Sequence, residues 1–257
     1  MPVNGLHLNQ LCHLERISVS GTSSNYHSFV VAEAAEAIAN SPLLAHLEIN
    51  YTRGSAPRPP LDRFLAKQSP EMRLSFSHVA IADMGDYCRV EPHLHALQSL
   101  ELVSLADDCP ESLMESRTLM AKIYNTLAHE RILLSRIVID DVFPAFLDYL
   151  SLYSGILTEI RILYLYKPVP WKELDELAVR FYASILPKHV DSLEIINISP
   201  MFTCKWCFHP REYSVFSQAK NLRSLNVSFA FTHLDPNPDY TLDNTVRDPY
   251  LACEISR

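Results

Sequence analysis

Eight short segments of the chain share one pattern of apolar residues. In each, an apolar residue is followed by two variable residues, an apolar residue, one variable residue and a third apolar residue, except that Glu71 opens the third segment. The segments are Leu14-Ile17-Val19, Leu44-Leu47-Ile49, Glu71-Leu74-Phe76, Leu97-Leu100-Leu102, Leu134-Ile137-Ile139, Leu157-Ile160-Ile162, Val190-Leu193-Ile195 and Leu222-Leu225-Val227. Their central residues are separated by steps of 30, 27, 26, 37, 23, 33 and 32 residues. This spacing is typical of a leucine-rich repeat array.

Stretches with helical periodicity lie between most of these segments. Residues 26–39 are rich in Ala and Glu, space their apolar residues three and four positions apart, and follow Ser and Asn residues that can cap a helix. A second stretch follows Pro110, a residue favoured in the first turn, and aligns Leu119, Ile123 and Leu127 on one stripe. We expect helices over 26–39, 111–127, 144–153, 171–186 and 212–219, and a proline-rich loop over 52–60.

Strand, loop and helix therefore alternate along the chain. A single unit of this kind exposes an apolar face, which stacking of neighbouring units buries. We predict an α/β fold, a right-handed leucine-rich-repeat-like solenoid with parallel strands on its concave face and helices on its convex face. About eight irregular units would occupy residues 1–231. Residues 232–257 are rich in Asp, Asn and Pro, and we interpret them as a polar tail that is disordered or at most caps the last unit.

An eight-stranded α/β barrel is the alternative architecture. Eight strand–helix units in about 250 residues also suit such a barrel, and an enzyme of this kind would use the Asp pairs that follow two of the strand segments. A barrel carries its chemistry on the loops after its strands, where glycines gather, but this chain has only 5 glycines. The fixed offset between the apolar residues is also not something that a barrel requires. The sequence therefore favours the solenoid.

The composition limits the classes of function. A formal net charge of −8, without any run of basic residues, argues against a nucleic-acid partner because such binding depends on clustered Lys and Arg. No window of about 18 apolar residues is present, so we expect no membrane-spanning segment. The first residues lack the features of a secretory signal, and the 6 cysteines are scattered along the chain. We therefore expect a reduced setting, cytoplasmic or nuclear.

Three stretches in the second half carry a more specific resemblance. They are FLDYLSLYSGILTEIRIL (146–163), FYASILPKHVDSLEIINI (181–198) and NLRSLNVSF (221–229). They resemble the leucine-rich-repeat, F-box-like protein family of mushroom-forming (basidiomycete) fungi, in which a YLSSYSGL-type phrase and an LPKHxxSL-type phrase each lead into a strand. Trp206 would match the Trp-containing loop that follows. The resemblance covers about residues 140–230.

This resemblance implies the substrate-reading half of an F-box adaptor of a cullin–RING ubiquitin ligase. An F-box is a helical module that docks onto the ligase, and the first repeat segment already begins at Leu14. We therefore expect no F-box in this chain, which would make it either a repeat-only relative or a truncated fragment without a separate function.

One cysteine cluster has the spacing of metal ligands. Cys204, Cys207 and His209 could supply two or three zinc ligands from a single turn, but a structural zinc site needs four and no second pair follows. As a redox pair, the two cysteines lack the strand-to-helix context of a thioredoxin-type motif. We interpret them as two ordinary thiols in a loop and expect no metal and no cofactor.

Two pairs of acidic residues follow strand segments. Asp107-Asp108 and Asp140-Asp141 could hold magnesium or act as an acid/base pair if they lined a pocket. On a repeat protein such residues are usually solvated loop charges or acids at a helix N-terminus. We therefore expect no catalytic residue among them.

The concave face of the predicted solenoid is the remaining candidate site. Side chains next to each central residue point away from the core, and Arg and Glu interleave among them. Such a mixed-charge ladder can select a protein partner, although a solvated face that binds nothing is the alternative. The expected protein-binding residues are Arg16, His46, Glu48, Arg73, Glu101, Arg136, Glu159, Arg161, Glu194 and Asn226. We predict a non-enzymatic protein-recognition scaffold that binds a protein partner directly and reaches ubiquitin-ligase subunits through another protein.

Overall fold

The computed structural model is an α/β protein with two compact units. It describes residues 10–21, 27–51, 59–69, 71–81, 84–103, 110–163, 170–200, 204–209, 213–229 and 252–256. Unit 1 comprises Met1–Leu105 and Thr118–Ile132, and unit 2 comprises Ala106–Arg117 and Leu133–Arg257. Among the described helices, none is long and apolar enough to cross a membrane.

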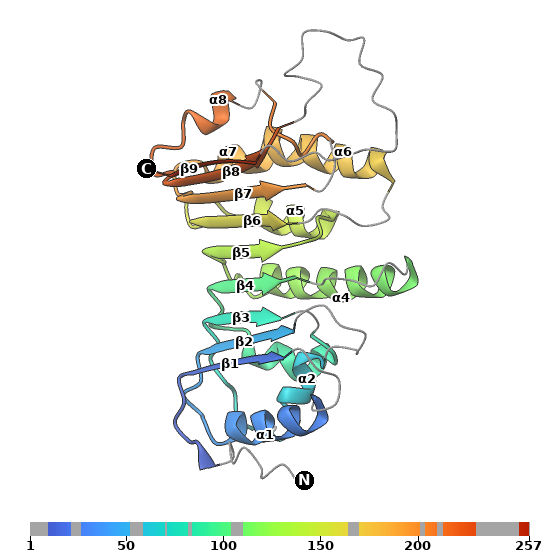
Figure 1. Ribbon diagram of the computed structural model, residues 1–257, viewed down its shortest axis with the longest axis vertical. Coiled ribbons are helices and arrows are strands. Elements are labelled where there is room, and N and C mark those ends of the chain that lie inside the picture. Colours follow the sequence, from blue (N-terminus) through green and yellow to red (C-terminus); the bar gives the residue numbers. More distant parts are fainter. Residues whose placement is uncertain are drawn as a thin grey trace. The chain divides into compact units, whose positions relative to one another are not determined.

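The described part of unit 1 holds four strands that pair in chain order, each parallel to the next. They are β1 (Arg16–Gly21), β2 (His46–Tyr51), β3 (His78–Ile81) and β4 (Ser99–Leu102). The helices are α1 (His27–Ala39), α2 (Leu61–Phe64), α3 (Tyr87–Val90), the 3-10 turn η3 (Glu91–His93) and the part of α4 (Pro110–His129) from Thr118 onward. Figure 1 shows the arrows of these strands side by side and pointing the same way.

Unit 2 repeats this arrangement and adds an antiparallel strand. Its strands are β5 (Arg136–Ile139), β6 (Glu159–Leu163), β7 (Ile195–Ser199), β8 (Ser224–Ser228) and β9 (Ala252–Ser256). The first four pair in parallel and in chain order, and β9 pairs antiparallel with β8. The helices are the part of α4 up to Arg117, α5 (Pro144–Ser151), α6 (Trp171–Arg180), the π-helical turn η4 (Phe181–Ile185), α7 (Leu186–His189) and α8 (Tyr213–Phe216).

The expected α/β class and the parallel order of the strands are confirmed within each unit. The alternative prediction of a closed eight-stranded barrel is wrong. A closed eight-stranded barrel requires its last strand to pair with its first. In unit 2, β8 already has β7 on one edge and β9 on the other, so no edge is left for closure.

A repeated backbone hydrogen bond starts the strands in both units. In unit 1, the carbonyl oxygen of Ala45 accepts from the N–H groups of Ser77 and His78, at 2.8 and 3.1 Å. In unit 2, the carbonyl oxygen of Ser135 accepts in the same way from Thr158 and Glu159, at 2.8 and 3.1 Å. The same pair of bonds thus stands at the start of β3 and at the start of β6. It fixes the register of each of these strands relative to the strand before it.

The predicted frame of the third strand, meaning the choice of residues for the three apolar places of the repeat pattern, is wrong by five residues. Val79, not Leu74, pairs with Leu47 on β2 and with Leu100 on β4. The repeat pattern is therefore carried by Phe76, Val79 and Ile81, all buried. Phe76 fits the last apolar place of the predicted frame and also the first apolar place of the observed frame. The apolar pattern alone therefore did not identify the correct frame.

The predicted frame of the seventh strand is wrong by three residues, for the same reason. Ile196, not Leu193, pairs with Ile160 on β6 and with Leu225 on β8. The pattern is Leu193-Ile196-Ile198. Val190, Leu193, Ile195, Ile196 and Ile198 are all apolar, so two frames satisfy the pattern equally.

The expected helices are all present. They correspond to α1, α4, α5, the run from α6 to α7, and α8, which is shorter than expected. The structure adds α2 and α3, which the sequence pattern did not indicate. It also places Ala252–Ser256 in β9, so this part of the expected polar tail caps the sheet rather than being disordered. Residues 52–58 of the expected loop and residues 230–251 of the tail lie outside the described residues.

Candidate functional site

The candidate site is the face of each sheet that carries polar side chains. We call it the open face of a unit, and define it as the strand residues immediately before and after the central residue of each repeat segment. In unit 1 these are Arg16, Ser18, His46, Glu48, His78, Ala80, Ser99 and Glu101. In unit 2 they are Arg136, Val138, Glu159, Arg161, Ile195, Asn197, Ser224 and Asn226. Most are half-buried. Among the central residues beside them, Ile17 and Leu225 are also half-buried, whereas the other six, such as Leu47 and Ile137, are buried.

A row of contacts crosses all four strands of unit 1. Arg16 Nη2 lies 3.4 Å from His46 Nδ1, the rings of His46 and His78 stack at 4.1 Å between centroids, and His78 Nδ1 lies 2.7 Å from Ser99 Oγ. The stack is nearly parallel, with an angle of 16° between the rings. The register places these four side chains opposite one another, so neighbouring strands hold one another's open-face groups in position.

The open face of unit 2 is charged instead. Glu159 Oε1 on β6 lies 3.1 Å from Nε of Arg136 on β5 and 2.6 Å from Nε of Arg161, two residues further along β6. The Glu159 side chain is 14% exposed, whereas those of Arg136 and Arg161 are 28% and 39% exposed. One carboxylate thus faces two guanidinium groups, and the cluster carries one net positive charge.

Eight of the ten predicted binding residues lie on an open face. They are Arg16, His46, Glu48, Glu101, Arg136, Glu159, Arg161 and Asn226. Arg73 and Glu194 do not, because each belongs to one of the two misassigned frames. Arg73 is exposed in the segment before β3, and Glu194 directly precedes β7, where it pairs with Arg223 at 3.4 Å.

The corrected frames bring His78 and Asn197 to the open faces, and the prediction missed both. The signal for His78 was present, because Phe76, Val79 and Ile81 fit the repeat pattern without the acidic exception that Glu71 requires. For Asn197 the sequence held no comparable signal, since both frames of β7 fit.

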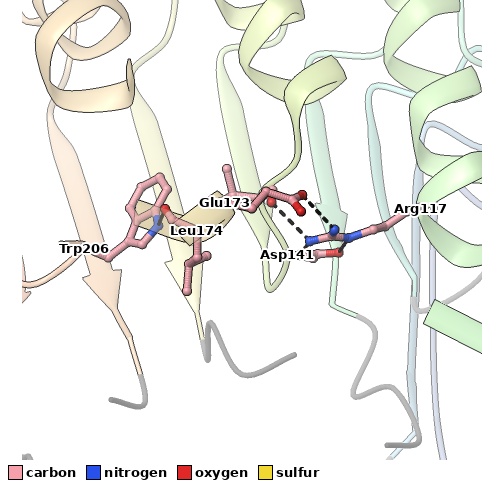
Figure 2. A network of polar contacts seen from close by, with 6 residues as sticks. Arg117, Asp141, Glu173, Leu174 and Trp206 are labelled. Atoms are coloured by element: carbon pink, nitrogen blue, oxygen red, sulfur yellow. Dashed lines mark hydrogen bonds and ion pairs between the residues drawn. The ribbon is translucent and has the colours of Figure 1, made fainter. Parts of the chain in front are cut away.

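The Asp140-Asp141 pair is buried, so its interpretation as solvated loop charge is wrong. Asp141 accepts two hydrogen bonds from Arg117, at 2.8 Å from Nε and 2.8 Å from Nη2, and Arg117 Nη1 lies 3.3 Å from Glu173 Oε1 (Figure 2). Burial opposes the charged form of Arg117, but its hydrogen bonds and charge interactions with Asp141 and Glu173 outweigh this and raise its pKa. Asp141 is therefore a structural ion-pair partner. Asp107-Asp108 lies outside the described residues.

The cysteine cluster lies in a short turn between β7 and β8. Cys204 is half-buried and Cys207 is buried, with Trp206 fully buried between them. Neither cysteine is part of a disulfide. Within the described part of the chain, no three His, Cys, Asp or Glu side chains gather in a way that could hold a metal ion.

Comparison with known proteins gives no match. No protein-family model, no curated protein and no solved structure matches this chain. The fold and the open faces therefore define only a class: an α/β protein whose parallel strands follow chain order within each unit and present rows of polar side chains.

Proposed function

We propose that this chain is a non-enzymatic protein-recognition scaffold and that the open face of unit 2 contacts its partner. The observation that carries this proposal is the cluster in which Arg136 and Arg161 share the carboxylate of Glu159. The two guanidinium groups suit a partner segment that bears carboxylates, because their forks of N–H donors match the geometry of carboxylate oxygens.

The cluster is positioned before any partner arrives. Its side chains stand on two paired strands, and Glu159 and Arg161 are neighbours on one of them. Groups already held in one geometry lose little conformational entropy on binding, which favours affinity and specificity. Asn197, whose Oδ1 accepts from Ser199 Oγ at 2.6 Å, lies opposite Arg161 in the register. It adds an amide donor to the same surface.

The resemblance to F-box-like repeat proteins supports a more specific role. In that role the chain would read a substrate or regulator in ubiquitin-ligase biology, with the ligase subunits bound through another protein. The three stretches that carry the resemblance include β6, β7 and β8, the strands that bear most of the open face of unit 2.

The test is affinity purification of the tagged chain from its own cells, with the variant Arg136→Glu/Arg161→Glu beside the natural chain. We expect proteins that co-purify with the natural chain to bind the variant at least about tenfold more weakly, because attractive charges become repulsive. The matched control is Arg63→Glu/Arg89→Glu, which makes the same change of net charge at two exposed positions of unit 1. Circular dichroism checks that both variants fold.

Three outcomes separate the alternatives. Loss of co-purifying proteins from Arg136→Glu/Arg161→Glu but not from the control variant supports the scaffold. Cullin or adaptor subunits among the lost proteins support the ligase role. Equal binding by both variants contradicts the assignment of the site to Arg136 and Arg161. A natural chain that retains no protein at all favours a fragment without a separate function.

A further inference from the structure

The turn that carries Cys204 and Cys207 has the geometry needed for a disulfide. The N–H of Cys207 donates to the carbonyl oxygen of Cys204 at 3.0 Å. A four-residue turn closed in this way keeps its end Cα atoms within about 7 Å, and disulfides join Cα atoms about 4.4–6.8 Å apart. The two thiols are also hydrogen-bonded to each other, so the sulfur atoms are already neighbours.

The two thiols differ in acidity and in access to solvent. The hydrogen bond to Cys207, together with burial, raises the pKa of Cys204, and the same hydrogen bond lowers the pKa of Cys207. The lowered pKa favours Cys207 as the thiolate, the form that reacts with oxidants. Cys204 is half-buried at the surface of the turn, so a small oxidant reaches the pair from its side.

The residues between the two cysteines hold the turn in place. The indole Nε1 of Trp206 donates to the carbonyl oxygen of Leu174 at 3.0 Å, and the hydroxyl of Tyr182 donates to the carbonyl oxygen of Trp206 at 2.9 Å (Figure 2 shows Trp206 beside Leu174). The N–H of Lys205 donates to Asp175 Oδ1 at 3.1 Å. Because these anchors lie within and beside the turn, they do not depend on whether the sulfur atoms are joined.

We propose that Cys204 and Cys207 are a redox modification site that forms a reversible disulfide with a peroxide as the oxidant. The Cys207 thiolate attacks one peroxide oxygen, the O–O bond breaks, and the products are a sulfenic acid and hydroxide. The sulfur of Cys204 then attacks the sulfenic sulfur, the S–O bond breaks, and the leaving hydroxide takes the Cys204 proton. In total two thiols lose two hydrogen atoms and the peroxide is reduced to two waters. An external dithiol reverses the reaction by exchange.

This site is independent of the proposed partner-binding function, and its test uses the native chain alone. The folded protein is exposed to hydrogen peroxide, its remaining thiols are blocked with iodoacetamide, and its peptides are analysed by mass spectrometry. We expect the peptide with Cys204 and Cys207 to lack two hydrogen atoms and to escape alkylation. Treatment with dithiothreitol should restore both thiols. The exposed Cys12 and Cys88 serve as internal controls for the oxidant and for the alkylation.

A second measurement uses Cys204→Ser. This variant removes the resolving thiol, so a sulfenic acid formed at Cys207 should persist and be trapped by dimedone. The proposal is overturned if both cysteines of the native chain are still alkylated at a peroxide dose that oxidises Cys12 and Cys88. It is equally overturned if the disulfide forms only after unfolding in urea.

Discussion

Two buried polar sites, one in each unit, take different chemical forms. In unit 1, the imidazole of His93 is buried, and its Nδ1 accepts the N–H of Leu74 at 2.9 Å, which makes it a neutral group that satisfies one backbone donor. In unit 2, the Arg117 guanidinium bridges Asp141 and Glu173, which makes a charged network beneath α6 (Figure 2).

The difference matters because a neutral hydrogen bond and a buried ion pair respond differently to the loss of one partner. A neutral hydrogen bond contributes about 0.5–1.5 kcal/mol, whereas removal of one partner from a buried ion pair costs about 3–5 kcal/mol because the other charge stays buried. The Arg117 network of unit 2 should therefore tolerate the loss of a partner less well than the His93 site of unit 1.

The largest effect is expected at Asp141. Its replacement in Asp141→Ala leaves the Arg117 guanidinium, 14% exposed, without its main partner, and we expect a loss of about 3–5 kcal/mol in the free energy of unfolding. Denaturant titration measures the loss, and hydrogen exchange should locate it in unit 2. A change below 1 kcal/mol would contradict the ion-pair account.

Two further variants sharpen this test. Glu173→Ala should cost about 0–1 kcal/mol, because the Glu173 side chain is 41% exposed and solvent screens its pairing with Arg117. The double variant Arg117→Met/Asp141→Leu removes both main charges, so it should be far more stable than Asp141→Ala.

Two glycines provide a matched pair between the units. Gly85 in unit 1 has φ +67°, and a Cβ there would come within 2.0 Å of Asp62 Oδ1 and 2.8 Å of Pro60 Cβ. Gly155 in unit 2 has φ +70°, but a Cβ would meet nothing within 4 Å. Gly155→Ala should cost about 1–2 kcal/mol for the left-handed backbone alone. Gly85→Ala should cost about 1–3 kcal/mol more, because of overpacking. Equal losses in thermal unfolding would show that Pro60 and the first turn of α2, which carries Asp62, shift without cost.

The sequence predicts the apolar framework better than the polar interior. Six of the eight strand frames follow from apolar spacing, because a residue such as Leu47 must pair and be buried in only one way. The frames centred on Val79 and Ile196 failed because neighbouring apolar residues, Phe76 and Leu193, fit two frames, and only the pairing of adjacent strands decides between them.

The polar contacts could not be predicted because they join residues far apart in the sequence. Arg117 follows no motif that points to Asp141, 24 residues away, and the distances become short only after α4 and β5 are packed. The Arg136–Glu159 pair was within reach of prediction, since both residues precede a central residue in correctly framed strands. The stacking of His46 on His78 was not, because His78 belonged to a misassigned frame.

The buried histidines His93 and His189 should make both units sensitive to acid. Burial is the main cause that lowers the pKa of each below the ordinary value of 6.5. The unfolded chain therefore takes up the proton first as the pH falls. The contribution of each histidine to stability is complete above pH 6.5 and is lost as the pH falls below that value.

Isosteric variants separate the two histidines. His93 uses Nδ1 as an acceptor, which His93→Asn can imitate, whereas His189 uses Nε2 as a donor to the carbonyl oxygen of Leu150, at 3.0 Å, which His189→Gln can imitate. Each variant should flatten the fall in stability between pH 6.5 and pH 5 in hydrogen exchange of its own unit only. If the stability of both units still falls between pH 6.5 and pH 5 in the double variant His93→Asn/His189→Gln, the acid sensitivity arises from other residues.

The smallest effects are expected on the open faces, where they should differ in kind between the units. Glu159→Gln in unit 2 removes a carboxylate from two half-exposed arginines, and Ser99→Ala in unit 1 removes the hydroxyl beside His78 Nδ1. We expect each to change the free energy of unfolding by about 1 kcal/mol or less. The effect of Glu159→Gln should shrink as salt is raised from 0.05 to about 1 M, because the Debye length falls to about 3 Å. The effect of Ser99→Ala should stay constant, because a single hydrogen bond made by a hydroxyl group is not screened in this way. A parallel decline in both would mean that the His46–His78 row also carries charge.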